Sequence, residues 1–277
     1  MTIPVCSVVS KNCYKEFLLL KFSLEQYHEC EWYLSCDEYC YNKLKGQLGI
    51  NAYLLIASDD CDHVVQNEQL RDNFTKLVMT KFVIAREGMK KHKSILLIDT
   101  DMIFVNKLDD WFLDFLKDEK IDGMLCQHMT DDAANEGRVG YFNVGMQVIG
   151  NPKFLDAWED VTGRHKELGL YFEQKPMEIV QRHFRTVNLP INYDLGWWRL
   201  NAEHLAYRRR AFNVKDNSIH IFDLPVINFH SHSLKELKHP NFGDFLISGM
   251  FLLMSKSDNP KYREFELYFD KVKNENL

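Results

Sequence analysis

The sequence of 277 residues predicts an α/β protein built on a parallel sheet with helices between its strands. Short apolar runs typical of buried strands alternate with longer amphipathic segments, which is the order of βαβ units. One run, Ser94 to Phe104, passes from four apolar residues directly into Asp99 and Asp101. Because ligands of open α/β sheets bind beyond the carboxyl ends of the strands, this run also marks where a site is expected.

The first part of the chain supplies four candidate strands and one long helix. The expected strands are Ile3 to Val9, Trp32 to Leu34, Ala52 to Ile56 and Ile95 to Ile98. Apolar residues at helical spacing from about Leu70 to Lys91 predict an amphipathic helix with favourable positive charge at its C-terminal end. This helix leads directly into the strand that carries the two aspartates.

The second part continues the alternation. Expected strands are Ile121 to Cys126, Tyr141 to Ile149 and His220 to Phe229, and expected helices are Pro152 to Thr162 and Phe172 to Phe184. Thr130 to Gly140 and the charged end from Ser255 onward are expected to be mobile. We expect a single domain over residues 1–240, with a helical extension over residues 241–277 packed on it.

Composition limits the partners and the location. The formal net charge of -6 gives no electrostatic footprint for nucleic acid. The seven cysteines have irregular spacings, and Cys36 with Cys40 has no matching pair for zinc, so reduced core thiols are expected. The first residues show no signal peptide, and the apolar stretch Phe242 to Met254 is too short to span a bilayer. These features predict a soluble, cytoplasmic protein without a transmembrane segment.

The aspartate pair and two later histidines suggest a metal site. Asp99 and Asp101 repel each other unless a cation joins them, and a divalent cation would in turn hold an anion such as a diphosphate. The alternative is a solvated turn after a strand. His230 and His232 end a later strand, where two histidines can complete an oxygen and nitrogen shell for manganese. Either histidine is a candidate, because strand alternation puts His230 on one face with Asn228.

Three further features have a functional and a structural interpretation. Thr80-Lys81 on the long helix can bring an ammonium to the same sheet edge, or can be solvated. Asn143 and Gly145 begin a strand, where the amide can bond ligand hydroxyls and the glycine admits a ligand, or they form a turn. Glu173-Gln174 can grip a polyhydroxylated ligand, or can complement a helix N-terminus.

Six motifs, in this chain order, resemble those of GT-A nucleotide-sugar glycosyltransferases, most closely the glycogenin and bacterial galactosyltransferase family. They are Thr80-Lys81, Asp99-Thr100-Asp101, Asn143-Val144-Gly145, Glu173-Gln174, Leu189-Pro190-Ile191-Asn192-Tyr193-Asp194, and His232 with Lys238. No single motif is specific for this family, but the occurrence of all six in the same order over residues 80–238 is. The resemblance implies a single-domain, Rossmann-like GT-A fold with a mixed, mostly parallel sheet flanked by helices. It also implies a divalent metal (usually Mn²⁺, or Mg²⁺) and a nucleotide-sugar donor held through its diphosphate.

The resemblance also implies roles for individual residues. Asp99 and Asp101 would meet ribose and metal, and His232 would be the third metal ligand. Residues expected to contact the donor are Ser10, Tyr14, Lys81, Asp99, Thr100, Asp101, Gly145 and Lys238, with Ser10 and Tyr14 near the nucleotide base. Catalytic candidates are Glu173, Gln174 and Asn143. Tyr193 and Trp197-Trp198 can form an aromatic floor for an acceptor sugar, or can belong to the core.

These features predict a metal-dependent glycosyltransferase. It would move a sugar from a UDP-sugar, or a GDP-sugar, to a hydroxyl of a glycan, glycolipid or protein, and the resemblance favours retention of configuration. Val144, Glu173 and Asp194 depart from the family's Ser, Asp and Asn, which leaves the sugar and the acceptor open.

Other classes remain possible from the sequence. A haloacid-dehalogenase-type phosphatase also places Asp-x-Asp after an apolar strand, but near the chain start and followed by Thr or Val where Ile103 stands. A sugar-nucleotide pyrophosphorylase would carry a glycine-rich loop, and Val8 to Tyr14 has no glycine. A catalytically inactive transferase-like protein that binds a sugar nucleotide or glycan is the alternative without turnover.

Overall fold

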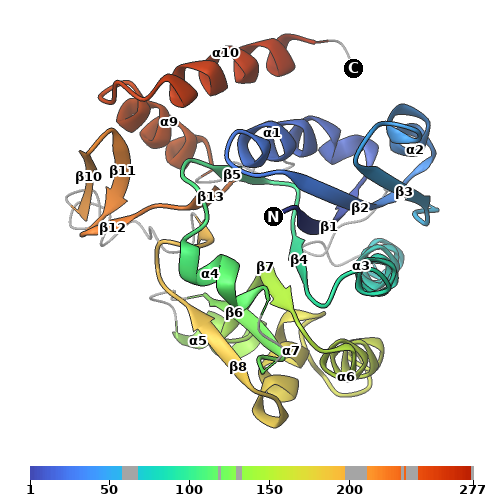
Figure 1. The fold of residues 1–277 in the computed structure, drawn as a ribbon. Coiled ribbons are helices and arrows are strands. Elements are labelled where there is room, and N and C mark those ends of the chain that lie inside the picture. The colour runs from blue at the N-terminus through green and yellow to red at the C-terminus, as the bar shows by residue number, and fades with distance from the viewer. Residues whose placement is uncertain are drawn as a thin grey trace.

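A computed structural model describes residues 1–57, 68–117, 120–128, 133–196, 211–231, 234 and 243–275. Its centre is a seven-stranded sheet with the order β3-β2-β1-β4-β7-β6-β8 (Figure 1). The bounds are β1 (Ile3–Val9), β2 (Cys30–Cys36), β3 (Ile50–Leu54), β4 (Ile95–Ile98), β6 (Gly123–Gln127), β7 (Phe142–Ile149) and β8 (Thr186–Leu189). Only β7 runs antiparallel to its neighbours in this sheet, so the predicted mixed, mostly parallel sheet is confirmed.

Helices cover both faces of the sheet. Alternate residues of β4 enter two different core clusters, Leu96 and Ile98 in one and Ile95 and Leu97 in the other. The first cluster includes side chains of α1 (Tyr14–Glu25), α2 (Glu38–Leu44) and α4 (Asp110–Phe115), and the second those of α3 (Glu68–Met89), α6 (Pro152–Gly163) and α7 (Gln174–Val180). Both faces of β4 are apolar, and each face packs against a hydrophobic cluster that helices contribute to.

Several predicted elements have the observed bounds or nearly so. β1 and β4 match their predicted ranges, because each is an apolar run that is buried almost throughout. The long helix α3 begins two residues earlier than Leu70 and ends at Met89. The helix predicted over Phe172 to Phe184 is shorter, because it consists of α7 followed by the 3₁₀ turn η2 (Gln181–His183).

The single strand predicted over His220 to Phe229 is wrong, since three short strands occupy this range. They are β11 (Ser218–Ile221), β12 (Leu224–Pro225) and β13 (Asn228–His230), and Phe222 turns the chain between the first two with a φ of 54°. β11 also pairs with β10 (Phe212–Lys215). β13 lies between β5 (Met102–Phe104) and β9 (Leu195–Gly196) in a separate three-stranded sheet. This small sheet brings the end of β13 to the residues that follow β4.

Two segments expected to be mobile are helical. Residues Ala133–Val139 form α5, which Gly140 ends with a φ of 116°. The charged end contains α10 (Pro260–Asn274), which follows α9 (Gly243–Met254). The buried residues of α10, listed in order, are Tyr262, Phe265, Phe269 and Val272, which is the spacing of one helix face. That face packs on the protein, with Tyr268 stacked on Phe22 of α1 at 4.0 Å between ring centroids.

Helices of membrane-spanning length and hydrophobicity do not occur among the described residues. Six cysteines lie in this part of the chain, and all six are free thiols. Four of them, Cys6, Cys36, Cys40 and Cys126, are buried, as expected for core thiols.

Candidate metal and donor site

The site forms where β4 and β13 end beside each other. Beyond β4, the Asp99 backbone N–H donates to the carbonyl of Gly145 on β7, at 2.7 Å. The chain then enters β5, whose antiparallel pairing with β13 sets His230 opposite Met102. The backbone N–H of Ser231 closes this arrangement by donating to the carbonyl of Asp101 at 2.8 Å. Backbone hydrogen bonds from two sheets therefore fix the residues that surround the aspartate pair.

Asp99, Asp101 and His230 converge at this point. One ligand atom from each lies within 4.8 Å of the others, and His230 Nε2 is 3.0 Å from Asp101 Oδ1. Asp101 and His230 are buried, whereas Asp99 is partly exposed. Two carboxylates and one imidazole at this separation are a donor set that suits a divalent cation such as Mn²⁺.

Asp194 holds the other nitrogen of His230. Its Oδ1 lies 2.7 Å from His230 Nδ1, and its carboxylate is fully buried. Burial alone would lower the pKa of His230, but the charges of Asp101 and Asp194 and their hydrogen bonds outweigh it and raise that pKa well above 6.5. Asp194 accepts a hydrogen bond from Nδ1, and Nε2 points toward Asp101. Histidines that bind a metal commonly have one ring nitrogen bonded to a carboxylate in this way and the other directed at the metal.

The backbone of Asp194 depends on the same strands. Its φ of 51° lies in the left-handed region, which Asp and Asn tolerate better than most residues. Its N–H donates to the side-chain oxygen of Asn228 on β13, at 3.1 Å. The carboxylate is therefore held beside β13 by both its conformation and a buried hydrogen bond.

Gly145 leaves room for the imidazole. A Cβ at this position would lie 2.4 Å from His230 Cε1, closer than any real side chain could come. The sequence predicts that this glycine admits a ligand, but the space beside it is taken by the imidazole of His230. Asn143 stabilises the backbone of β7 at this position, because its side-chain oxygen accepts a hydrogen bond from the Gly145 N–H at 2.7 Å.

Lys81 lies between two carboxylates. Its Nζ is 2.8 Å from Asp99 Oδ1 and 3.5 Å from Glu173 Oε1, and both Lys81 and Glu173 are buried. Burial would lower the pKa of Lys81, but Asp99 and Glu173 raise it above its ordinary value, so the ammonium stays charged. Lys81 is thus not the solvated helix lysine of the alternative interpretation.

Glu173 precedes α7 but does not cap it. Its carboxylate makes no side-chain hydrogen bond to the helix N-terminus and instead faces Lys81. Its backbone carbonyl accepts the indole N–H of Trp158 on α6 at 2.8 Å, which fixes the residue between two helices. Gln174 follows as the first residue of α7.

The remaining predicted contacts have more varied surroundings. Thr100 is buried between the two aspartates, and Ser10 is buried at the end of β1, the neighbour of β4. Tyr14 belongs to the core, edge-on to Tyr39 with 5.6 Å between ring centroids, and burial raises its pKa to about 12. His232, Lys238 and Trp197-Trp198 lie outside the described residues.

Tyr193 does not form an acceptor floor. Its side chain is fully buried and stacks on Phe112, with 5.4 Å between ring centroids. Its hydroxyl donates to Asp109 Oδ2 at 2.8 Å. Tyr193 therefore belongs to the core, and the predicted contact with an acceptor sugar is wrong for this residue.

No protein-family profile matches the chain, and no curated protein matches it in sequence. Its fold, however, matches solved structures, among them galactosyltransferase LgtC in complex with donor and acceptor sugar analogs. That match has a TM-score of 0.55 at 12% identity and covers 95% of this chain and 100% of LgtC. The chain has the GT-A fold.

Two other glycosyltransferases share this GT-A fold. Mouse xyloside xylosyltransferase 1 in its apo form matches with a TM-score of 0.54 at 10% identity, over 86% of this chain and 100% of that one. GlyE of Streptococcus pneumoniae matches with a TM-score of 0.55 at 14% identity, over 100% of this chain and 66% of GlyE. The chain thus spans about two thirds of GlyE but the whole length of the other two.

Proposed function

We propose that this GT-A protein is a metal-dependent glycosyltransferase. It transfers a sugar from a nucleotide-diphosphate donor, most readily a UDP-sugar, to a hydroxyl of a glycan, glycolipid or protein. The observation that carries this proposal is the convergence of Asp99, Asp101 and His230 beyond the carboxyl end of β4. In the sheet order β3-β2-β1-β4-β7, the crevice between β1 and β4 is a topological switch point, where open α/β sheets bind ligands.

The residues at this point fit a divalent cation. The two aspartates supply oxygen ligands and negative charge, Asp194 orients the imidazole, and Gly145 leaves the space that the ring occupies. We propose Mn²⁺, with Mg²⁺ as the alternative, held by Asp99, Asp101 and either His230 or His232. When bound, the cation would stabilise the charge that develops on the departing nucleoside diphosphate.

The chain's own residues would position the donor. Lys81 keeps Asp99 and Glu173 in fixed orientations, which suits contacts to ribose and to the donor sugar. Thr100, Gly145, Ser10, Tyr14 and Lys238 complete the proposed donor site. Glu173, Gln174 and Asn143 are the proposed catalytic residues, with Glu173 on the donor sugar in a retaining reaction. One LgtC structure is of an active-site variant in which Gln is replaced by Glu, so a glutamine belongs to the active site of that protein.

We also propose a cytoplasmic location, because free thiols at all six described cysteines suit a reducing compartment. We further propose that residues 1–240 form the glycosyltransferase domain and that residues 241–277 form a helical extension packed on it.

Thermal unfolding in the presence of donors tests the proposed function. A ligand that binds only the folded state raises the melting temperature. We expect a rise with one class of UDP- or GDP-sugar that requires Mn²⁺ and that Asp101→Ala abolishes. Asp160→Ala, which removes an exposed carboxylate of α6, serves as the control and should behave as wild type. No shift with any nucleotide, or an equal shift in Asp101→Ala, would contradict the proposal.

A further inference from the structure

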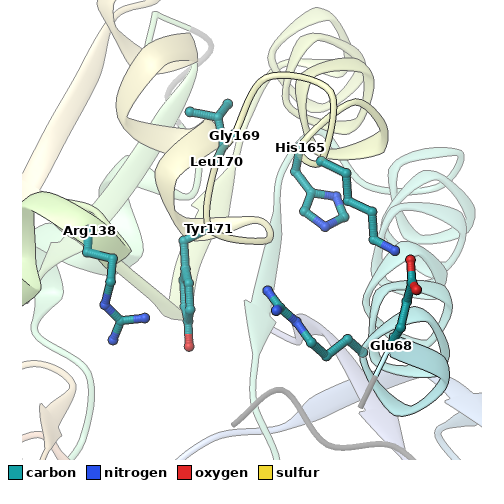
Figure 2. A pocket seen from close by; sticks show the side chains of 8 residues that line it. Glu68, Arg138, His165, Gly169, Leu170 and Tyr171 are labelled. Atoms are coloured by element: carbon teal, nitrogen blue, oxygen red, sulfur yellow. The ribbon is translucent and has the colours of Figure 1, made fainter. Parts of the chain in front are cut away.

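A cavity of about 620 Å³ opens between the first turns of α3, helix α5 and the segment that leads into α7. Side chains that line it are Glu68, Arg71, Arg138, His165, Lys166 and Tyr171. Figure 2 shows Arg138 beside Tyr171 on one side of the cavity and Glu68 with His165 on the other. Its volume is that of a small-ligand site.

The charge of the lining is opposite to that of the protein. Among the described residues, the lining contains the cationic side chains of Arg71, Arg138 and Lys166 and one carboxylate, that of Glu68, in a chain whose formal net charge is -6. Lys166 forms an ion pair with Asp72, and Arg71 and Arg138 add two guanidinium groups to the lining. A guanidinium presents several N–H donors in one plane and binds carboxylate and phosphate groups in a bidentate manner.

Consecutive aromatic rings support the two arginines. Arg138 Cζ lies 5.0 Å from the centroid of the Tyr171 ring, and Arg71 Cζ lies 5.6 Å from that of Phe172. Phe172 has a φ of 36°, so the chain turns sharply between Tyr171 and Glu173. Its ring also packs edge-on against Phe74 of α3, 4.9 Å between centroids. The rings thereby restrict both guanidinium groups, which lowers the entropy lost when an anion binds.

The cavity adjoins the proposed donor site through two elements. Tyr171 stands two residues before Glu173, whose carboxylate contacts Lys81. Arg71 and Lys81 lie on the same helix α3, ten residues apart, which corresponds to about 15 Å along its axis. A short oligosaccharide is long enough to cover this axial separation.

We propose that this cavity binds an anionic group of the acceptor, a carboxylate or a phosphate carried by a sugar. This inference rests on the proposed glycosyltransferase function and names the chemical class of its acceptor. The donor's own diphosphate belongs to the aspartate cluster, so the second anion site selects the other substrate.

Ligand-observed NMR with matched sugars tests the proposal on the full chain. The probes are methyl β-glucuronide against methyl β-glucoside, and glucose 6-phosphate against glucose. We expect an anionic probe to bind at least roughly tenfold more tightly than its neutral partner. Arg71→Ala and Arg138→Ala should each remove that difference, whereas Arg263→Ala, an exposed arginine of α10, should keep it. Tighter binding of the glucuronide would identify the acceptor's anionic group as the carboxylate of a uronic acid. Tighter binding of glucose 6-phosphate would identify it as the phosphate of a phosphorylated glycan.

Equal binding of charged and neutral probes would overturn the inference, as would an unchanged difference in Arg71→Ala and Arg138→Ala. An equal loss in Arg263→Ala would also overturn it, because the attraction would then belong to the whole surface. Hydrolysis of the donor by the wild-type protein with Mn²⁺ is measured in parallel without acceptor. Absence of hydrolysis counts against the glycosyltransferase proposal, and absence of anion binding counts against the cavity alone.

Discussion

His230 is engaged by a carboxylate at each ring nitrogen, Asp101 at Nε2 and Asp194 at Nδ1. The sequence indicates a histidine near the aspartate pair, but the family motif, with a lysine six residues later, favours His232. The pairing of β13 with β5 brings His230 to the cluster, while His232 lies outside the described residues. Asp194 appears in the sequence only as a departure from the family's Asn, and its contact with His230 depends on tertiary structure.

Replacement of Asp194 tests its control of His230. Asp194→Ala removes the acceptor for His230 Nδ1, so Mn²⁺ affinity should fall by about 10- to 100-fold, as for other residues that orient metal ligands. Asp194→Asn keeps both an acceptor oxygen and tolerance of the left-handed backbone, so it should retain most of the affinity. Isothermal titration with Mn²⁺ measures both. Equal affinities in the wild type and Asp194→Ala would show that Asp194 does not orient a ligand.

At the scale of elements, the site depends on the close approach of β7 to the end of β13. Gly145 is the contact point, because a side chain there would overlap His230. The sequence indicates a glycine at a strand start, but which group it accommodates follows only from the packing of two separate sheets.

Gly145→Ala should therefore disturb both the fold and the site. We expect a loss of about 1–3 kcal/mol in the free energy of unfolding, from overpacking, together with weaker Mn²⁺ binding. Gly249→Ala on α9 is the matched control, because its Cβ meets no atom within 4 Å, and it should gain up to about 1 kcal/mol. Urea unfolding and Mn²⁺ titration measure the two effects. Wild-type Mn²⁺ affinity in Gly145→Ala would contradict the described packing.

Strands that are buried throughout can be predicted from the sequence, and short strands in turns cannot. β4 is an uninterrupted apolar run and β1 contains one polar residue, Ser7, so the bounds of both follow from their composition. β10 and β11 are joined by Asp216-Asn217, both with positive φ, a two-residue hairpin turn without the usual glycine. The helix α10 falls within the helical extension expected over residues 241–277, but the mobility expected from Ser255 onward is wrong, because four buried residues among the charged side chains form one helix face.

At the scale of the whole molecule, a further, partly buried histidine connects the turn after α1 to the segment before α4. His28 Nε2 accepts the backbone N–H of Leu108 at 2.9 Å, which requires the neutral ring. Burial, and then the positive charges of Lys261 and Lys107, lower the pKa of His28 from 6.5 to about 4. Protonation is therefore favoured in the unfolded chain, and folding loses stability as the pH falls from about 6.5 toward 4.

The pH dependence of unfolding checks this link. The free energy of unfolding in urea should decrease between pH 6.5 and pH 4 partly because of His28. His28→Gln keeps an acceptor for Leu108 but does not titrate, so its decrease should be smaller than that of the wild type. Identical pH profiles for the two proteins would show that His28 does not contribute.

The central proposal for the molecule as a whole is that metal-dependent sugar transfer takes place where β1 and β4 of this GT-A fold end. The fold and the position of the aspartate pair could be predicted from the sequence, because each follows from an apolar strand and its end. Asp194 and the arginine cavity could not, because they join segments far apart in the chain.

The most direct measurement is release of nucleoside diphosphate from UDP- and GDP-sugars by the purified protein, with and without Mn²⁺. We expect release from one donor class that depends on Mn²⁺ and is abolished by Asp101→Asn, but not by Asp160→Asn on the exposed surface of α6. No release, release without a metal, or equal release by Asp101→Asn would contradict the claim.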